Sequence, residues 1–181
     1  QALDQETGEH RPERQADAEG GAQQAEGPGA RMAVEVLGQG GRAAGKGCRA
    51  ITMPELPHLE GLPSYHNLDY WGPVFQTFSD TGLVMCLHIG QGFNAITTPD
   101  EAPIDNLIIL ATQVSALAVQ DLLWGGAMHR YPDLKIAWSE AGIGWIPFYL
   151  DRCDRHYTNQ RWLGHDFGDK LPSDIFRDHS L

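Results

Sequence analysis

The chain has 181 residues, a formal net charge of −11 and a hydrophobic fraction of 41%. This length suits one ordinary domain and falls short of the roughly 250 residues of a complete (β/α)8 barrel. The acidity argues against a nucleic-acid surface, because neutralising phosphates requires clustered Lys and Arg. The longest apolar run, around Leu107 to Ala111, is bracketed by polar residues, so we expect no membrane-spanning segment.

The cysteines Cys48, Cys86 and Cys153 are odd in number and widely spaced. They fit reduced thiols in a cytoplasmic protein better than a disulfide framework. The N-terminus has no basic region followed by an apolar stretch, so the sequence shows no secretory signal. Because the chain starts at Gln1 and stops at Leu181, soon after a helix start, we expect an internal piece of a longer protein.

Residues 1–46 differ in composition from the rest of the chain. Gln1 to Ala30 is rich in Glu, Gln, Gly and Ala, and Leu3 is its only large aliphatic residue. Such a segment cannot bury enough apolar surface to offset the entropy of ordering it. We therefore expect a disordered or non-native leader over residues 1–46, with Gln1 to Ala30 unstructured and dispensable, and a folded domain over residues 47–181. A functional tail is the alternative for the leader.

From Gly47 onward, segments typical of strands and helices alternate. Gly47 to Pro54 predicts a short strand ended by proline, and Leu56 to Asn67 predicts a loop. Leu68 to Asp80 has helical spacing and is closed by Thr81 and Gly82. Leu83 to Ile89 is a continuous apolar run, typical of a strand that is buried on both faces.

The same alternation continues to the C-terminal half. Ile104 to Trp124 predicts a long apolar helix, and Met128 to Tyr131 a short one that ends at Pro132. Leu134 to Glu140 predicts a third strand, and Gly142 to His156 a further helix. The order strand, helix, strand, helix, strand, helix without hairpin turns predicts an α/β fold with parallel strands.

Two polar residues stand where predicted strands end. His88 closes the second strand and Glu140 closes the third. In a β/α barrel the active site lies at the carboxyl ends of the strands, so we expect both side chains on one face of the sheet, within about 10 Å of each other. Imidazole and carboxylate groups suit a divalent metal such as zinc. The alternatives are a hydrogen-bonded structural histidine and a glutamate that caps the next helix.

The loop after the first strand holds weaker candidates. Glu55 could face the same site, although a Pro-flanked glutamate in a loop is usually solvated. His58 and His66 lie where they could approach a substrate, with surface positions as the alternative. No role is assigned to the remaining histidines of the predicted domain, which are His129, His156, His165 and His179. The chain also has no nucleophile elbow and no phosphate-binding loop motif.

Two stretches carry a family resemblance. Residues Met85 to Gly90, with the sequence MCLHIG, and Tyr131 to Pro147, with the sequence YPDLKIAWSEAGIGWIP, resemble the amidohydrolase-related family. That family includes metal-dependent hydrolases and the aminocarboxymuconate-semialdehyde and resorcylate types of decarboxylase. The resemblance covers Gly47 to Leu181 and implies a partial (β/α)8 TIM barrel comprising its fourth, fifth and sixth strands. It matches His88 to the metal-ligand histidine of the fifth strand and places Glu140 where many members carry a second histidine.

The sequence also departs from the family pattern. No two of the eight histidines are two positions apart, so the His-x-His pair of the first strand is absent, and the late aspartate would lie beyond Leu181. The departure at Glu140 leaves open whether it is a metal ligand, a proton-transfer group or neither. With so few ligands we expect this chain to be inactive by itself.

The resemblance implies a parent enzyme that uses a divalent metal, zinc in the first place. It would hydrolyse or decarboxylate, without oxidation, a small carboxylate, amide or lactone. Its partner would be that small-molecule substrate, without nucleic acid or membrane, and homo-oligomerisation of the parent is left open. The alternative is a non-catalytic remnant or binding module of the same fold, whose unpaired strand edges would be exposed.

Overall fold

The structure is a computed structural model that describes residue 38, residues 40–90, residue 92 and residues 95–181. The segment Gln1 to Ala30, predicted to be unstructured, lies outside the described residues. Within the predicted leader, residues 40–45 are helical, and the amides of Lys46 and Cys48 both bond the Ala43 carbonyl where this helix ends.

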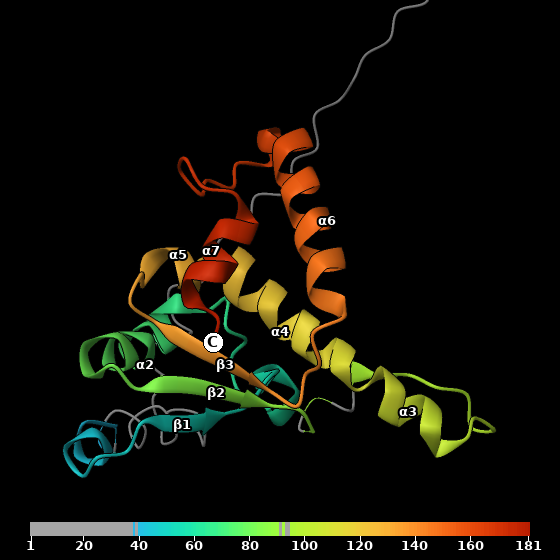
Figure 1. The fold of residues 1–181 in the computed structure, drawn as a ribbon, viewed down its shortest axis with the longest axis horizontal. Helices are drawn as coiled ribbons and strands as arrows, with labels where there is room; N and C mark the ends of the chain where they lie inside the picture. The colour runs from blue at the N-terminus through green and yellow to red at the C-terminus, as the bar shows by residue number, and fades with distance from the viewer. Residues whose placement is uncertain (1–37, 39, 91, 93–94) are drawn as a thin grey trace, which may run out of the picture.

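Three parallel strands form the centre of the fold, as the sequence predicts (Figure 1). They are β1 (Ala50–Met53), β2 (Val84–His88) and β3 (Lys135–Ser139), hydrogen-bonded in the order β1-β2-β3. The register pairs Met53 with Leu87 and His88 with Ser139, so the three carboxyl ends meet at one edge of the sheet.

The prediction that β2 is buried on both faces is wrong for the described residues. Met85, Leu87 and Ile136 are 0% exposed, whereas the alternate positions of the same strands are only half-buried or exposed. Side chains alternate between the two faces of a strand, so the described helices bury one face of the sheet and leave the other partly open. Cys86 and His88 lie on this open face.

Helices follow each strand, with the boundaries close to those predicted. The first, α2 (Leu68–Thr81), begins where the Asn67 side chain accepts the Tyr70 amide at 3.0 Å. It ends at Gly82, whose φ of 66° is the left-handed conformation that terminates helices. Two short 3-10 helices, η2 (Pro57–Glu60) and η4 (Arg161–Leu163), and three α-helices complete this part of the fold. The α-helices are α5 (Ala127–Arg130), α6 (Trp145–Asn159) and α7 (Pro172–His179).

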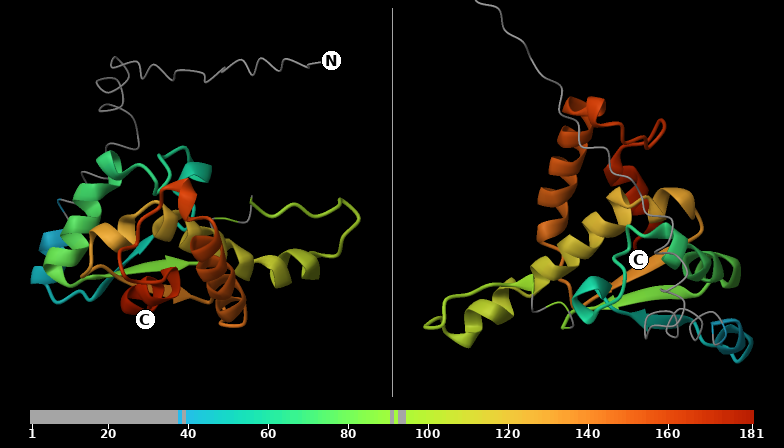
Figure 2. Two further views of the ribbon diagram at one scale, coloured as in Figure 1. Left: turned by 90° about the horizontal axis from the view of Figure 1, so that it is seen from above. Right: turned by 180° about the vertical axis from the view of Figure 1, so that it is seen from behind.

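The long helix predicted over Ile104 to Trp124 is two consecutive helices, α3 (Ile104–Leu110) and α4 (Thr112–Trp124). They meet at Ala111, whose amide bonds the Ile108 carbonyl three residues back, as in a tighter helical turn. No residue of α3 is buried, and Figures 1 and 2 show α3 projecting beyond the sheet. By contrast, α4 packs in the core with Val114, Ala118 and Leu122 at 0% exposure.

The expectation that no segment has the length and composition to cross a membrane is wrong. The 21 residues Ile104–Trp124 contain a window with a mean hydropathy of 1.6, of which 44% is buried. The core helix of a soluble protein passes the same test, and the α4 half of this segment is a core helix.

An aromatic cluster fixes the loop that follows β1. Tyr65, Trp71 and Phe75 are 0% exposed and their rings lie 5.0–6.5 Å apart. The Tyr65 hydroxyl donates to the Pro54 carbonyl at 2.5 Å, and the Trp71 indole donates to the Pro63 carbonyl at 2.8 Å. One bond closes the loop on itself and the other joins it to α2, and together they fix the position of the residues just after β1.

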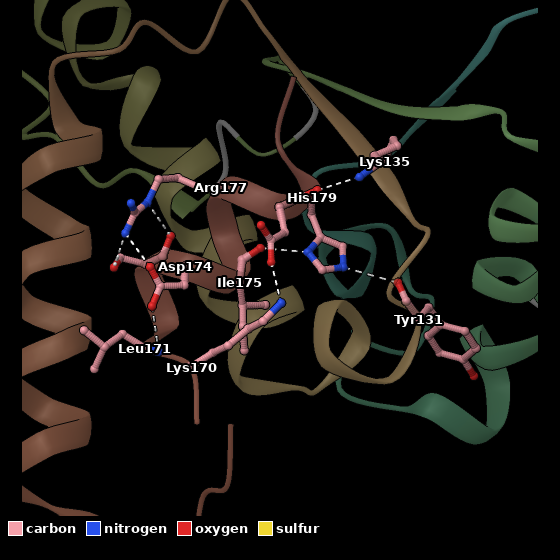
Figure 3. A network of polar contacts seen from close by, with 10 residues as sticks. Tyr131, Lys135, Lys170, Leu171, Asp174, Ile175, Arg177 and His179 are labelled. Carbon is pink, nitrogen blue, oxygen red and sulfur yellow. Dashed lines mark hydrogen bonds and ion pairs between the residues drawn. The ribbon is translucent and has the colours of Figure 1, made fainter. Parts of the chain in front are cut away.

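The C-terminal helix α7 is tied to β3 by polar contacts (Figure 3). Lys135 donates to the Asp178 carbonyl at 2.6 Å, and both ring nitrogens of the buried His179 face carbonyl oxygens, those of Ile175 and Tyr131. These contacts bring the residue after α7, Ser180, into a parallel bridge with Ile136. The chain thus begins to pair a fourth parallel segment with β3, although the described residues do not close a barrel.

Candidate active site

The side chains of His88 and Glu140 meet at the carboxyl edge of the sheet. His88 is the last residue of β2, and Glu140 directly follows β3. The distance from His88 Nε2 to Glu140 Oε2 is 3.7 Å, with the two side chains 49% and 70% exposed. This confirms that the two residues lie together on one face of the sheet. Because the contact is longer than a hydrogen bond, neither group fully satisfies the other.

Hydrogen bonding orients the imidazole of His88. Its Nδ1 lies 2.7 Å from the Ile89 carbonyl oxygen, which can only accept. Nδ1 must therefore carry the proton, and in the neutral ring Nε2 keeps a free lone pair. An Nδ1–H bond to a carbonyl is the usual support of a histidine that acts through Nε2 as a base or metal ligand.

The backbone of Glu140 is strained. Its φ of 60° is the only positive φ of a non-glycine residue among the described residues. A left-handed conformation costs an L-residue roughly 1–2 kcal/mol, and such strain is typical of functional sites. Gly142, two residues later, also has a positive φ of 65°, so the chain turns sharply after β3 and aims Glu140 towards β2.

Glu55 completes the same edge from β1. It follows Met53 and Pro54, but it is 0% exposed rather than solvated. Ser115 of α4 donates to Glu55 Oε1 at 2.7 Å, while Oε2 has no hydrogen-bond partner among the described residues. Burial raises the pKa of the Glu55 carboxyl, against smaller lowering effects of the Ser115 hydroxyl, the Gly90 amide and the charge of His88.

The sequence could have indicated Glu55 more strongly. It is the second residue after β1, much as Glu140 is the first residue after β3, and the apolar residues Leu56 and Pro57 that follow it are buried. Its proline neighbours instead predict a solvated loop position, and this prediction is wrong. Ser115, its partner, lies 60 residues away on α4, and no local pattern points to this pairing.

The other loop histidines form a separate cluster. His66 Nε2 lies 3.2 Å from one oxygen of Asp121, and His58 Nδ1 lies 3.9 Å from the other. Both imidazoles are about half exposed, so the expected surface position holds, and they tie the loop after β1 to α4. Neither histidine contacts His88 or Glu140 through a hydrogen bond or ion pair in the described part of the chain.

His88 and Glu140 are side chains of the types that could hold a divalent metal together. Two ligand atoms bound at about 2.1 Å by a tetrahedral zinc lie about 3.4 Å apart, near the 3.7 Å observed here. Within residues 38, 40–90, 92 and 95–181, however, no group of three or more His, Cys, Asp or Glu side chains is arranged to hold a metal ion. The pair could supply at most two of the three protein ligands that a catalytic zinc site needs.

Comparison with known proteins agrees with this geometry at the level of fold. No protein-family model matches the sequence, and no curated protein matches it. The structure is similar to the crystal structure of an amidohydrolase from Mycobacterium avium subsp. paratuberculosis K-10, with a TM-score of 0.64 and 15% sequence identity. The fold is amidohydrolase-like. The match covers 80% of this chain but only 37% of that amidohydrolase, so this chain spans well under half of its neighbour's length.

Proposed function

We propose that this chain carries part of the active site of a metal-dependent hydrolase or non-oxidative decarboxylase. The observation that carries the proposal is the convergence of His88 Nε2 and Glu140 Oε2, 3.7 Å apart, at the carboxyl edge of a parallel sheet. The amidohydrolase-like fold supports it, because β/α folds of this kind place their chemistry at that edge. The substrate class is a small carboxylate, amide or lactone.

In this proposal His88 and Glu140 hold a divalent metal, zinc in the first place. When bound, such a metal lowers the pKa of a coordinated water to about 7 or stabilises negative charge on a substrate. His88 binds through Nε2, since Nδ1 is engaged by the Ile89 carbonyl. Glu140 adds a negative charge that offsets the metal and, being 70% exposed, can also exchange a proton with solvent or substrate.

The buried carboxyl of Glu55 lies beside the site. Burial favours its protonated form, and a neutral carboxyl can donate a hydrogen bond where a carboxylate only accepts. Through Ser115 it ties the end of β1 to α4, and it lies near Gly90 in the loop that follows His88. We propose that Glu55 sets the position of this loop and hence of the His88 ring.

The alternative is a binding module of the same fold without catalysis. The observation that favours it is the absence, within the described residues, of a third side chain arranged with His88 and Glu140 around a metal. Zinc binding discriminates between the two proposals, because a binding module needs no metal at this edge.

The test is the zinc stoichiometry of the 181-residue chain after equilibrium dialysis, measured by mass spectrometry of the metal. At saturating zinc we expect one weakly bound ion, which is lost in His88→Ala and in Glu140→Gln. His129→Ala is the matched control, because His129 is exposed and makes no polar contact with either residue in the described part of the chain. Zinc binding that is equal in wild type, His88→Ala and His129→Ala would refute the metal proposal and favour the binding module.

A further inference from the structure

A second site lies between α4 and α6. A pocket of about 390 Å³ opens between the two helices, and none of its lining residues belongs to the candidate active site. From α6 it is lined by one face of the helix, at positions three and four residues apart: Tyr149, Arg152, Cys153 and His156. Gln120 and Trp124, one turn apart on α4, and His165 from the loop after η4 complete it. The volume falls within the range of small-molecule sites.

The floor of this pocket is uncharged and its polar groups are paired. The Gln120 amide oxygen accepts the Trp124 indole N–H at 2.7 Å, and its nitrogen lies 3.4 Å from the Cys153 sulfur. Burial raises the pKa of the Cys153 thiol, so the sulfur stays protonated at neutral pH. A ligand therefore meets no buried charge at the floor, and an apolar ring is favoured there.

Aromatic rings form the walls. The Trp124 ring lies 5.5 Å from His156 and 5.0 Å from His165, both nearly perpendicular to it. Tyr149 is fixed on the α6 side by edge contacts with Trp145 and Phe148. Aromatic rings that line a pocket favour planar ring ligands, which gain from stacked and edge contacts beyond simple burial.

A guanidinium without an acidic partner stands at the rim. No carboxylate among the described residues pairs with Arg152. The nearest acidic residues along α6 are engaged elsewhere, since Asp151 pairs with Arg155 at 2.9 Å and Asp154 accepts the Ser173 amide at 2.9 Å. In a chain with a net charge of −11, an unpaired cation beside aromatic walls selects for an anion that can bind the guanidinium fork.

We propose that this pocket binds a planar aromatic carboxylate, with its ring against Trp124 and Tyr149 and its carboxylate on Arg152. The site is independent of the proposed chemistry at His88 and Glu140. It lies on the helix layer, whereas the candidate active site lies at the edge of the sheet.

Naphthoate is the probe, titrated into the isotopically labelled 181-residue chain and followed by amide chemical shifts. We expect saturable shifts centred on α6 around Arg152, and about tenfold weaker binding in Arg152→Gln. Arg155→Gln is the matched control, because Arg155 lies on the same helix, pairs with Asp151 and does not line the pocket. It should bind within about twofold of wild type, and the neutral naphthalenemethanol should bind wild type at least about tenfold more weakly than naphthoate does.

Five results would overturn the proposal, and the first four concern naphthoate binding itself. They are no saturable shift up to about 10 mM naphthoate, equal binding by Arg152→Gln and Arg155→Gln, equal binding of acid and alcohol, or shifts centred on His88 instead of α6. Inorganic phosphate that displaces naphthoate at equal concentration would also overturn it, because it would indicate a simple anion site. Thermal unfolding of each variant checks that the folded state is retained, and both arginines are exposed enough for neutral replacement.

Discussion

Replacing Glu140 by glycine should give a more stable fold than replacing it by alanine, although both changes remove the same candidate active-site group. Glu140 has a φ of 60°, and its side chain is 70% exposed with one ion-pair contact, to His88 at 3.7 Å. The Glu140 side chain therefore adds little to the free energy of unfolding, whereas its left-handed backbone conformation lowers it. A glutamate at this position is better explained by a functional role than by a contribution to stability.

The magnitude follows from comparing Glu140→Gly with Glu140→Ala. Both remove the carboxylate, and an exposed ion pair of this kind contributes about 0–1 kcal/mol. Alanine keeps the left-handed cost of roughly 1–2 kcal/mol, whereas glycine avoids it but loses about 0.4–1 kcal/mol through the entropy of the unfolded chain. The glycine variant should therefore be about 0.5–1 kcal/mol more stable than the alanine variant.

Urea unfolding at neutral pH measures this difference, and in a domain of this size about 1 kcal/mol corresponds to roughly 2–4 °C in Tm. Glu101 provides the control pair, because it is exposed and its φ is not positive. There the order should reverse, with Glu101→Gly less stable than Glu101→Ala. If Glu140→Gly is no more stable than Glu140→Ala, the backbone of Glu140 is not strained, and its conformation is no sign of a functional role.

Three further changes test other parts of the structure. The raised pKa of Glu55 means that the folded state binds its proton more tightly than the unfolded state, so this contribution to stability is complete below about pH 4 and is lost as the pH rises through the folded pKa. Glu55→Gln should therefore unfold at higher urea than wild type at pH 7, and this gain should vanish near pH 4, while the exposed Glu60→Gln shows neither effect. Gly82→Ala should cost about 1 kcal/mol in urea unfolding, because φ is 66° and the added Cβ would meet no atom within 4 Å, so that only backbone strain opposes it; no loss would show that the end of α2 relaxes. Lys170→Met should raise the pKa of Asp178 towards its ordinary value in an NMR titration, because the hydrogen bond and charge of Lys170 lower that pKa; an unchanged value would assign the lowering to another group.

Local patterns predicted the elements well because each boundary depends on residues near it. The end of α2 follows from Gly82, and the end of β1 from Pro54. The prediction that β2 is buried on both faces failed for a different reason. The apolar run Leu83 to Ile89 shows that the strand could be buried on both faces. Among the described residues, however, helices cover only one of its two faces.

The pairing of His88 with Glu140 was predictable because topology alone brings them together. Residues at the carboxyl ends of neighbouring parallel strands share an edge whatever the intervening helices do. The state of Glu55 was not predictable in this way, since its burial depends on Ser115, which lies on a helix 60 residues further along the chain. The pocket between α4 and α6 depends likewise on two helices and a loop that share no sequence motif.

The difference between neighbouring and distant strands also limits the chemistry that this chain can carry out. Side chains on adjacent strands keep their relative positions through the ladder of β2 and β3, so the distance between His88 and Glu140 needs no further strand to define it. A third metal ligand from a distant strand would require further strands that close the sheet. The described residues contain only the first residue pair of a fourth parallel strand, the bridge between Ser180 and Ile136. We therefore expect the two-residue pair to form in this chain and to bind zinc weakly, while turnover of carboxylates, amides or lactones stays absent even in excess zinc. Metal-dependent turnover by the 181-residue chain that disappears in His88→Ala would show that two protein ligands are enough here.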